Sequence, residues 1–108
     1  MNDTQALLAL AALAHPLRLK IFRALVVVGS PGLAAGAIQM GVDVPAATLS
    51  FHLKELAESG LVTQERAGRH FIYRAAYDQM NGLLGYLTEN CCAGAECAVQ
   101  PAAATCGC

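Results

Sequence analysis

The hydrophobic pattern of this chain changes once, at residues 61–74. Elsewhere apolar residues recur at helical spacing, but residues 61–66 and 70–74 form two short runs typical of β-strands. Ala67, Gly68 and Arg69 separate the two runs, and a glycine at this place is typical of a hairpin turn. The sequence therefore predicts a mainly α-helical protein with one two-stranded β-hairpin.

Five helices are predicted, at residues 4–14, 16–28, 33–40, 45–59 and 77–90. Thr4 is the expected N-cap of the first helix, and Pro16 suits the first turn of the second. The turn at residues 29–32 and the glycines Gly41 and Gly60 end the helices that precede them. The expected apolar faces consist of Leu7, Leu8, Ala11, Ala14, Leu17, Ile21, Leu25, Val28, Leu49, Leu53, Leu56, Met80, Leu83, Leu84 and Leu87.

The composition favours a single folded domain. The chain has 108 residues, of which 56% are apolar and 14% are charged, and this balance excludes an intrinsically disordered protein. It is also more apolar than a small monomer needs, and the first helix is apolar on most sides. We therefore expect a homodimer whose interface is built by the first and last helices.

The net charge of −1 gives no general sign of nucleic-acid binding, so such a function has to rest on local charge placement. The longest charge-free stretch inside the domain, residues 24–42, is broken by the turn at 29–32, unlike a membrane-spanning helix. The first residues lack the basic flank of a signal peptide, so we expect a cytoplasmic protein with no membrane partner. No phosphate-binding glycine loop or nucleophile elbow stands out, which argues against an enzyme.

The cysteines are confined to one segment: Cys91, Cys92, Cys97, Cys106 and Cys108. Disulfides that staple a fold join distant segments, and these cysteines cannot do so. In a reducing cytosol, a local thiol cluster indicates a site for a soft metal ion or metalloid, or a redox switch. The plain alternative is a reactive tail without function. We divide the chain into a domain at residues 1–90 and a cysteine-rich, partly mobile segment at residues 91–108.

The order of the predicted elements is itself informative. A helix, a short helix, a tight turn, a second helix and a hairpin follow one another between residues 16 and 74. This is the order of a winged helix-turn-helix, in which the second helix of the pair enters the major groove of DNA. The fold class expected is thus a winged helix-turn-helix with about five helices and two strands.

Five parts of the chain resemble the ArsR/SmtB family of repressors: residues 14–21 (AHPLRLKI), 48–56 (TLSFHLKEL), 59–62 (SGLV), 66–69 (RAGR) and Tyr73. The likeness spans roughly residues 5–90, and residues 48–56 are its most specific part. Members of this family are homodimeric winged-helix repressors that leave their operator when a metal or metalloid binds. The resemblance therefore implies a transcriptional repressor, double-stranded operator DNA as its partner, and an inducing ion.

The residues predicted to contact DNA lie on the second helix of the pair and on the hairpin: Thr48, Ser50, Phe51, His52, Lys54, Arg66, Arg69 and His70. Hydroxyl groups contact bases or phosphates, and a lysine suits a phosphate. The hairpin carries three arginines against one glutamate, with Arg69 at its tip. The alternatives are a solvated helix face with Phe51 half-buried, and a charged hairpin edge that prevents aggregation.

Two inducer sites of the family are missing their ligands here. Residues 33–40 carry no cysteine for the arsenic site on the first helix of the pair, and the last helix has Asp78 but no histidine for the zinc site. The cluster Cys91, Cys92 and Cys97 resembles the C-terminal three-thiol arsenic site of some members. Trivalent arsenic favours three thiolates in a pyramid, and antimony is the close alternative.

Geometry limits how those three thiols meet. Residues six apart on a helix point about 240° apart, so Cys91 and Cys97 cannot converge on one continuous helix. We expect a break at residues 93–95 that lets the chain fold back. Zinc or cadmium would take a fourth ligand from Cys106 or Cys108, and a thiol-redox switch is a further alternative. A winged helix that binds another protein is the rival class; it would need neither Arg69 nor the thiols.

Overall fold

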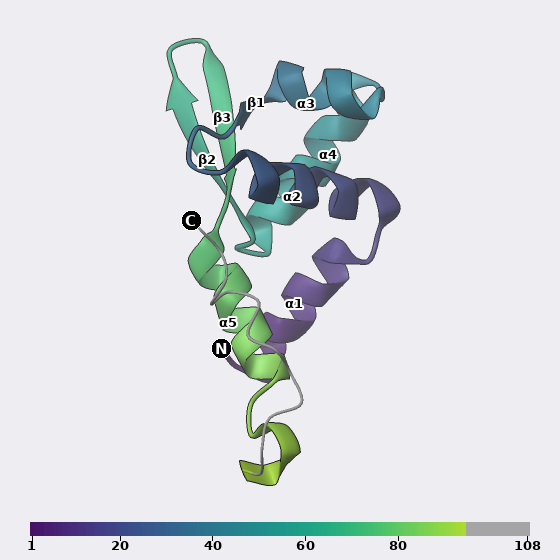
Figure 1. Ribbon diagram of the computed structural model, residues 1–108. Coiled ribbons are helices and arrows are strands. Elements are labelled where there is room, and N and C mark those ends of the chain that lie inside the picture. Colours follow the sequence, from purple (N-terminus) through teal and green to yellow (C-terminus); the bar gives the residue numbers. More distant parts are fainter. Residues whose placement is uncertain (95–108) are drawn as a thin grey trace.

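The computed structural model describes residues 1–94 of the chain. Its elements are α1 (Asp3–Leu13), α2 (Pro16–Val28), β1 (Leu33–Ala34), α3 (Ala35–Val42), α4 (Ala46–Glu58), β2 (Val62–Ala67), β3 (His70–Ala75), α5 (Tyr77–Leu87) and the short 3-10 helix η1 (Cys91–Gly94). Figure 1 shows the hairpin and α3 at one end of the molecule, and α1 with α5 at the other. The fold is a winged helix-turn-helix, which confirms the predicted class.

The three strands form an antiparallel sheet in the order β1-β3-β2. The predicted hairpin is confirmed, with Gly68 at a φ of 63° in its turn. The prediction of only two strands was wrong. Leu33 pairs with Tyr73 and Ala34 pairs with Ile72, so the segment expected to begin a helix forms a third strand and α3 starts two residues later. Two residues are too short a run for a periodic signal, and this pairing depends on a distant strand.

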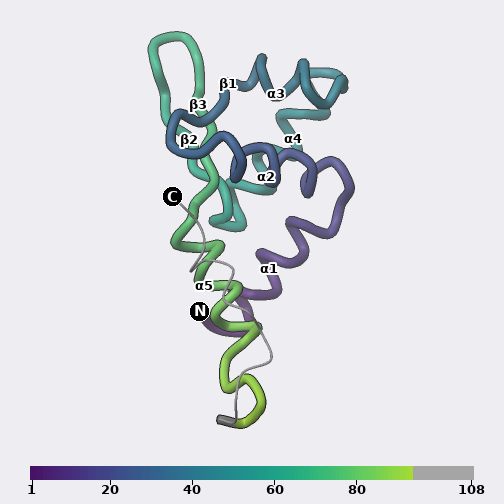
Figure 2. Tube along the Cα trace, viewed as in Figure 1, coloured from purple at the N-terminus to yellow at the C-terminus, as the bar shows by residue number. Residues whose placement is uncertain are grey.

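The core lies between α2, α4 and the base of the sheet. Ile21, Leu25, Leu56 and Leu61 are fully buried there, and Leu49 and Leu53 are nearly so. The predicted inward faces of α2 and α4 are thereby confirmed. Figure 2 shows α2 crossing in front of α4 below the hairpin. One face of α4 is buried in the core, and the other face is exposed.

Helix α1 presents its smallest side chains to the core. Ala6, Ala9 and Ala12 are buried, whereas Leu7 is 66% exposed and Leu8 is 55% exposed. The predicted apolar stripe of Leu7, Leu8, Ala11 and Ala14 therefore faces away from the core of this subunit. Thr4 is not the N-cap either: Asn2 accepts a hydrogen bond from the Gln5 backbone, and the Gln5 side chain accepts one from the Asn2 backbone, forming a capping box.

Helix α5 packs beside α1 and ends at Leu87, three residues earlier than predicted. Leu83 is buried, while Leu84 is 51% exposed and Leu87 is 55% exposed. After Thr88 the backbone turns, and Asn90 takes a left-handed φ of 56°. Among the helices of residues 1–94, none is long and apolar enough to span a membrane.

Candidate nucleic-acid interface

The turn between α3 and α4 sets the direction of the second helix. Asp43 ends α3 with a left-handed φ of 52°, and its backbone N–H donates to the Gln39 carbonyl at 2.8 Å. The Gln39 side chain donates to the carbonyl of Val44 at 3.1 Å, which ties the turn to the helix before it. Pro45 then precedes α4 in extended conformation. Gln39 was not singled out from the sequence, because a single glutamine on a helix has no distinctive spacing.

The open side of α4 carries four of the predicted DNA-binding residues. Thr48, Ser50, Phe51 and Lys54 are exposed between the buried leucines of the same helix. Phe51 is 55% exposed, a large aromatic ring on a polar face. In a helix-turn-helix, the residues at the start of the second helix are those that reach base edges.

His52 does not belong to this group, and here the sequence prediction was wrong. Its side chain is 7% exposed and faces the junction of α1 and α2 instead of solvent. Residues one apart on a helix differ by about 100° in direction, so an exposed Phe51 leaves its neighbour on another side. Position 52, next to the buried Leu53, therefore belongs to the buried face of α4.

The hairpin carries the other predicted residues at its tip. Arg66, Arg69 and His70 are exposed, and the Arg66 Nε donates to the carbonyl of Gly68 at 3.2 Å within the turn. Figure 1 shows this tip and the start of α4 at the same end of the molecule, opposite α1 and α5. We call the exposed set the reading surface: Thr48, Ser50, Phe51, Lys54, Arg66, Arg69 and His70.

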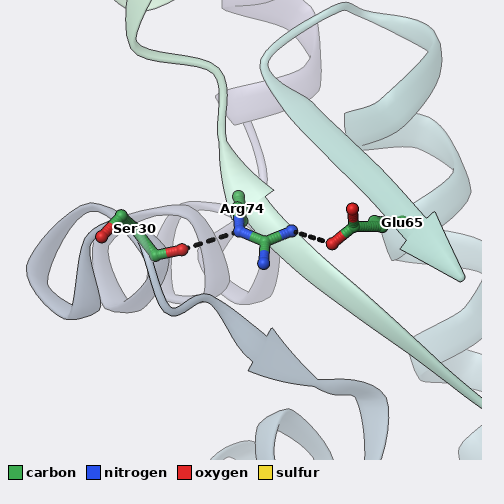
Figure 3. Close-up of polar contacts among 3 residues, drawn as sticks. All are labelled: Ser30, Glu65 and Arg74. Carbon is green, nitrogen blue, oxygen red and sulfur yellow. Dashed lines mark hydrogen bonds and ion pairs between the residues drawn. The ribbon is translucent and has the colours of Figure 1, made fainter. Parts of the chain in front are cut away.

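Arg74 fastens the hairpin to the rest of the fold (Figure 3). Its Nε donates to the Ser30 carbonyl at 2.7 Å, and its Nη1 forms an ion pair with Glu65 at 2.9 Å. The guanidinium is therefore committed to protein contacts, and the basic charge at the tip comes from Arg66 and Arg69. Together with the β1–β3 pairing, this contact joins the hairpin to the loop that leads into α3.

His52 sits in a small polar cluster under the reading surface. Its ring lies 4.4 Å from the ring of His15, centroid to centroid, and its Nδ1 is 3.5 Å from the Nη1 of Arg18. Burial lowers the pKa of His52, and the charges of His15 and Arg18 lower it further, while Glu55 acts in the opposite direction. His52 is therefore neutral near pH 7. No sequence pattern groups His15 with His52, since they are far apart in the chain.

Two of the predicted thiols lie side by side after α5. The sulfurs of Cys91 and Cys92 are 3.4 Å apart, too far for a disulfide, in which they are about 2.05 Å apart. Two sulfurs bound to one ion at about 2.3 Å each are roughly 3.3–3.8 Å apart. Cys92 is exposed and takes a left-handed φ of 59°. This pair has the spacing that two ligands of one soft ion need.

The helix was expected to reach these thiols, and it does not. The chain leaves the helix at Thr88, ahead of the break predicted at residues 93–95, and Cys92 and Ala93 are both left-handed. Cys97, Cys106 and Cys108, and the expected mobility of their segment, lie outside the described residues. Within residues 1–94, no group of three metal-binding side chains is assembled.

Comparison with known proteins decides the class. A helix-turn-helix domain family matches residues 13–65. The HTH-type transcriptional regulator YgaV of Escherichia coli K12 is 31% identical over 88 residues, which cover 82% of this chain and 87% of that protein. The chain belongs to the ArsR-like family of helix-turn-helix transcriptional regulators.

Two solved structures agree with this assignment. An ArsR-like transcriptional regulator from Rhodococcus sp. RHA1 is 26% identical, with a TM-score of 0.68 over 78% of this chain and 76% of that one. The transcriptional repressor BigR from Xylella fastidiosa is 28% identical, with a TM-score of 0.62 over 79% and 84% of the two chains. In this ArsR-like regulator, α3 and α4 are the helix-turn-helix pair and β2–β3 is the wing.

Proposed function

We propose that this ArsR-like regulator is a repressor that binds operator DNA as a homodimer and leaves it when trivalent arsenic or antimony binds Cys91, Cys92 and Cys97. The observation that carries the proposal is the pair of thiol sulfurs 3.4 Å apart beside the end of α5. The similarity to BigR, a transcriptional repressor, supports repression over activation.

The reading surface supports the DNA-binding part. It combines hydroxyl groups and an aromatic ring on α4 with two arginines on the wing. Phe and Thr side chains suit the methyl group of thymine, and serine and threonine hydroxyls suit either bases or phosphates. Lys54, Arg66 and Arg69 supply the phosphate contacts that a chain of net charge −1 otherwise lacks.

The inducer chemistry follows from the thiols. Arsenous acid carries three hydroxyl groups on arsenic, and each is replaced by one cysteine sulfur. Three As–S bonds form and three As–O bonds break, and each thiol proton leaves with a hydroxyl group as water, so the oxidation state does not change. Cys91 and Cys92 supply two sulfurs at a suitable spacing, and Cys97 supplies the third. Soft thiolates select soft centres over the hard ions of the cytosol.

The position of Cys91 and Cys92 favours an indirect mechanism of induction. Both follow α5, at the end of the molecule opposite the reading surface (Figure 1), so we expect an ion bound there to act on DNA binding from a distance. The leucines exposed on α1 and α5 are suited to bury against a second copy. An ion that reshapes the end of α5 would then change the angle between two subunits, whose recognition helices must match half-sites about 34 Å apart.

A gel-shift measurement tests the whole proposal. The full chain is mixed with genomic DNA fragments, and the retained fragments are titrated with arsenite, zinc or a thiol oxidant. We expect retention of specific fragments and release by arsenite. Retention that only zinc or the oxidant reverses would assign the thiols to one of those inducers. The absence of any retained fragment would contradict DNA binding and favour the protein-binding class.

The dimer is predicted to depend on the outward leucines. Replacing Leu7 and Leu87 by glutamate places charges on a surface that two copies would bury, where each leucine contributes about 1.5–3 kcal/mol. Sedimentation at micromolar concentration should show a dimer for the native chain and a monomer for the double variant. Val27→Glu is the matched control, because Val27 is 86% exposed but lies on α2 and on neither α1 nor α5. A native chain that sediments as a monomer would contradict the prediction.

The salt dependence of DNA binding tests whether the tip of the wing contacts phosphate. Each phosphate contact that is removed should reduce the slope of log affinity against log salt by about 0.9, so Arg69→Ala should reduce it by about 2 in a dimer. Fluorescence anisotropy with one operator fragment at several salt concentrations measures the slope. Arg23→Ala removes an equally exposed arginine from α2 and should leave it unchanged. If Arg69→Ala behaves like Arg23→Ala, the wing tip does not contact phosphate.

A further inference from the structure

We propose that Arg18, His15 and His52 form a junction that positions the recognition helix α4 for DNA, and that the junction opens when His52 takes a proton. The proposal rests on the DNA binding proposed above. His15 and Arg18 lie at the start of α2 and His52 lies on the buried side of α4, and Arg18 also binds a carbonyl at the end of α1. The junction is therefore placed to control how α4 sits on the helices beneath it.

Arg18 is the link between α1 and α4. Its Nε donates to the Ala12 carbonyl at 2.7 Å, and its Nη1 lies 3.5 Å from His52 Nδ1. Ala12 is in the last turn of α1, where carbonyls have no partner within the helix and where a positive charge is favourable. The side chain of Arg18 thus donates a hydrogen bond to a carbonyl at the end of α1 and also contacts the middle of α4.

His15 adds the third contact. Its Nδ1 accepts a hydrogen bond from the Leu17 backbone at 3.1 Å and so caps the start of α2. Its ring stands against the ring of His52, with centroids 4.4 Å apart and planes tilted by 42°. His52 in turn meets Phe51 of the reading surface in an edge-on contact at 5.4 Å. The cluster therefore continues from the α1–α2 junction to an exposed ring that faces DNA in the proposed complex.

In these contacts the Nδ1 atoms of His15 and His52 both face donors. A guanidinium and a backbone N–H are donors only, so each Nδ1 acts as the acceptor and the ring proton sits on Nε2. A proton added to either Nδ1 turns an acceptor into a donor that faces another donor. On His52 it also places a positive charge beside Arg18 and against His15, in a side chain that is 7% exposed.

The surrounding charges do not compensate a proton on His52. On the side of α1, the carbonyl of Ala12 at the helix end is bound by Arg18. From α2, His52 meets His15 and Arg18, both of which disfavour a positive charge. On α4 itself Glu55 favours the charge, but its effect is the smallest of those acting on His52, and Glu55 and Glu58 line a groove that they share with Arg18. Protonation is therefore expected to separate the rings and release α4.

The folded chain should become less stable as the pH is lowered. The pKa of His52 is lowered in the folded chain, so the unfolded chain binds the proton more readily. The free energy of unfolding should be at its full value above the ordinary pKa of 6.5 and should fall as the pH is lowered below it. Loss of DNA affinity should follow the same range, because the form that takes up a proton is the one with α4 released.

The experiment measures DNA affinity and the titration of His52 by NMR between about pH 7.5 and about pH 5.5. All chains carry His70→Gln, because a protonated imidazole on the wing would strengthen phosphate binding and mask the effect. We expect affinity to fall at least about fivefold over this range. His52→Gln keeps an acceptor for Arg18 but has no proton to take up, so its profile should be flatter. A purely structural role for His52 would lower affinity equally at every pH, which would overturn the proposal.

Arg18→Gln provides a second test that does not need DNA. It removes the positive charge beside His52, so His52 should titrate at a higher pH in the DNA-free protein than it does in the native chain. A titration that does not move would show that Arg18 and His52 are uncoupled and would overturn the junction. Failure to bind DNA at any pH would instead contradict the proposed function. The NMR titration would still test whether Arg18 and His52 are coupled.

Discussion

Serine at Cys91, Cys92 or Cys97 is expected to leave the repressor on its operator when arsenite is added. Serine is nearly the same size as cysteine but offers a hard oxygen, which a thiophilic ion binds poorly. Allosteric coupling of about 1–3 kcal/mol weakens DNA binding roughly 5- to 150-fold on induction, and each variant should lose that change. Anisotropy of a labelled operator, titrated with arsenite, measures it.

The remaining cysteines supply the matched controls. Serine at Cys106 or Cys108 should leave the response to arsenite as it is, since three sulfurs complete a pyramidal site. A Cys97→Ser chain that still responds normally would contradict the three-thiol site. A response that disappears only with Cys106 or Cys108 would move the site further along the chain and favour a four-coordinate ion such as zinc.

Gly32→Ala should be among the most destabilising substitutions in the domain. Gly32 precedes β1 with a φ of +68°, where a side chain costs about 1–2 kcal/mol. An added Cβ would also lie 2.7 Å from the Tyr73 carbonyl oxygen and 2.8 Å from the Ile72 side chain, and relieving such overpacking costs about 1–3 kcal/mol. The free energy of unfolding should therefore fall by about 2–5 kcal/mol in urea denaturation.

Gly68→Ala separates the two causes. Gly68 has a similar φ of +63°, but nothing lies within 4 Å of the added Cβ. Its cost should be that of the backbone alone, about 1–2 kcal/mol. Equal losses for the two variants would show that the close approach of Gly32 to β3 does not contribute.

Much of the fold was predictable because its signals are local. Pro16 and the 29–32 turn bound α2 at the residues predicted, and Leu49, Leu53 and Leu56 repeat along one side of α4. Gly68 marks the hairpin turn in the same way. Propensity, capping and periodicity within about a dozen residues decide these features, so a single sequence carries them.

The errors involve contacts between distant segments. Leu33 and Ala34 form a strand only because β3 is beside them, and His52 is buried by a histidine and an arginine of another helix. In α1 the composition of alanines and leucines was clear, but which of them face the core depends on where α2, α4 and α5 lie. The candidate site was thus predicted in its outline on α4 and the wing, and missed where tertiary packing reassigns a residue.

The pairing of β1 with β3 has a mechanical consequence. The strand that hydrogen-bonds to the wing runs directly into α3, and Arg74 binds the loop just before it, so the wing and the helix pair form one stiff unit. In the proposed complex, the base of the wing would therefore move together with α3. If the chain binds DNA as proposed, we expect each subunit to lose its groove contact and its backbone contact together. A partly released subunit, held by the wing alone, should not accumulate during dissociation.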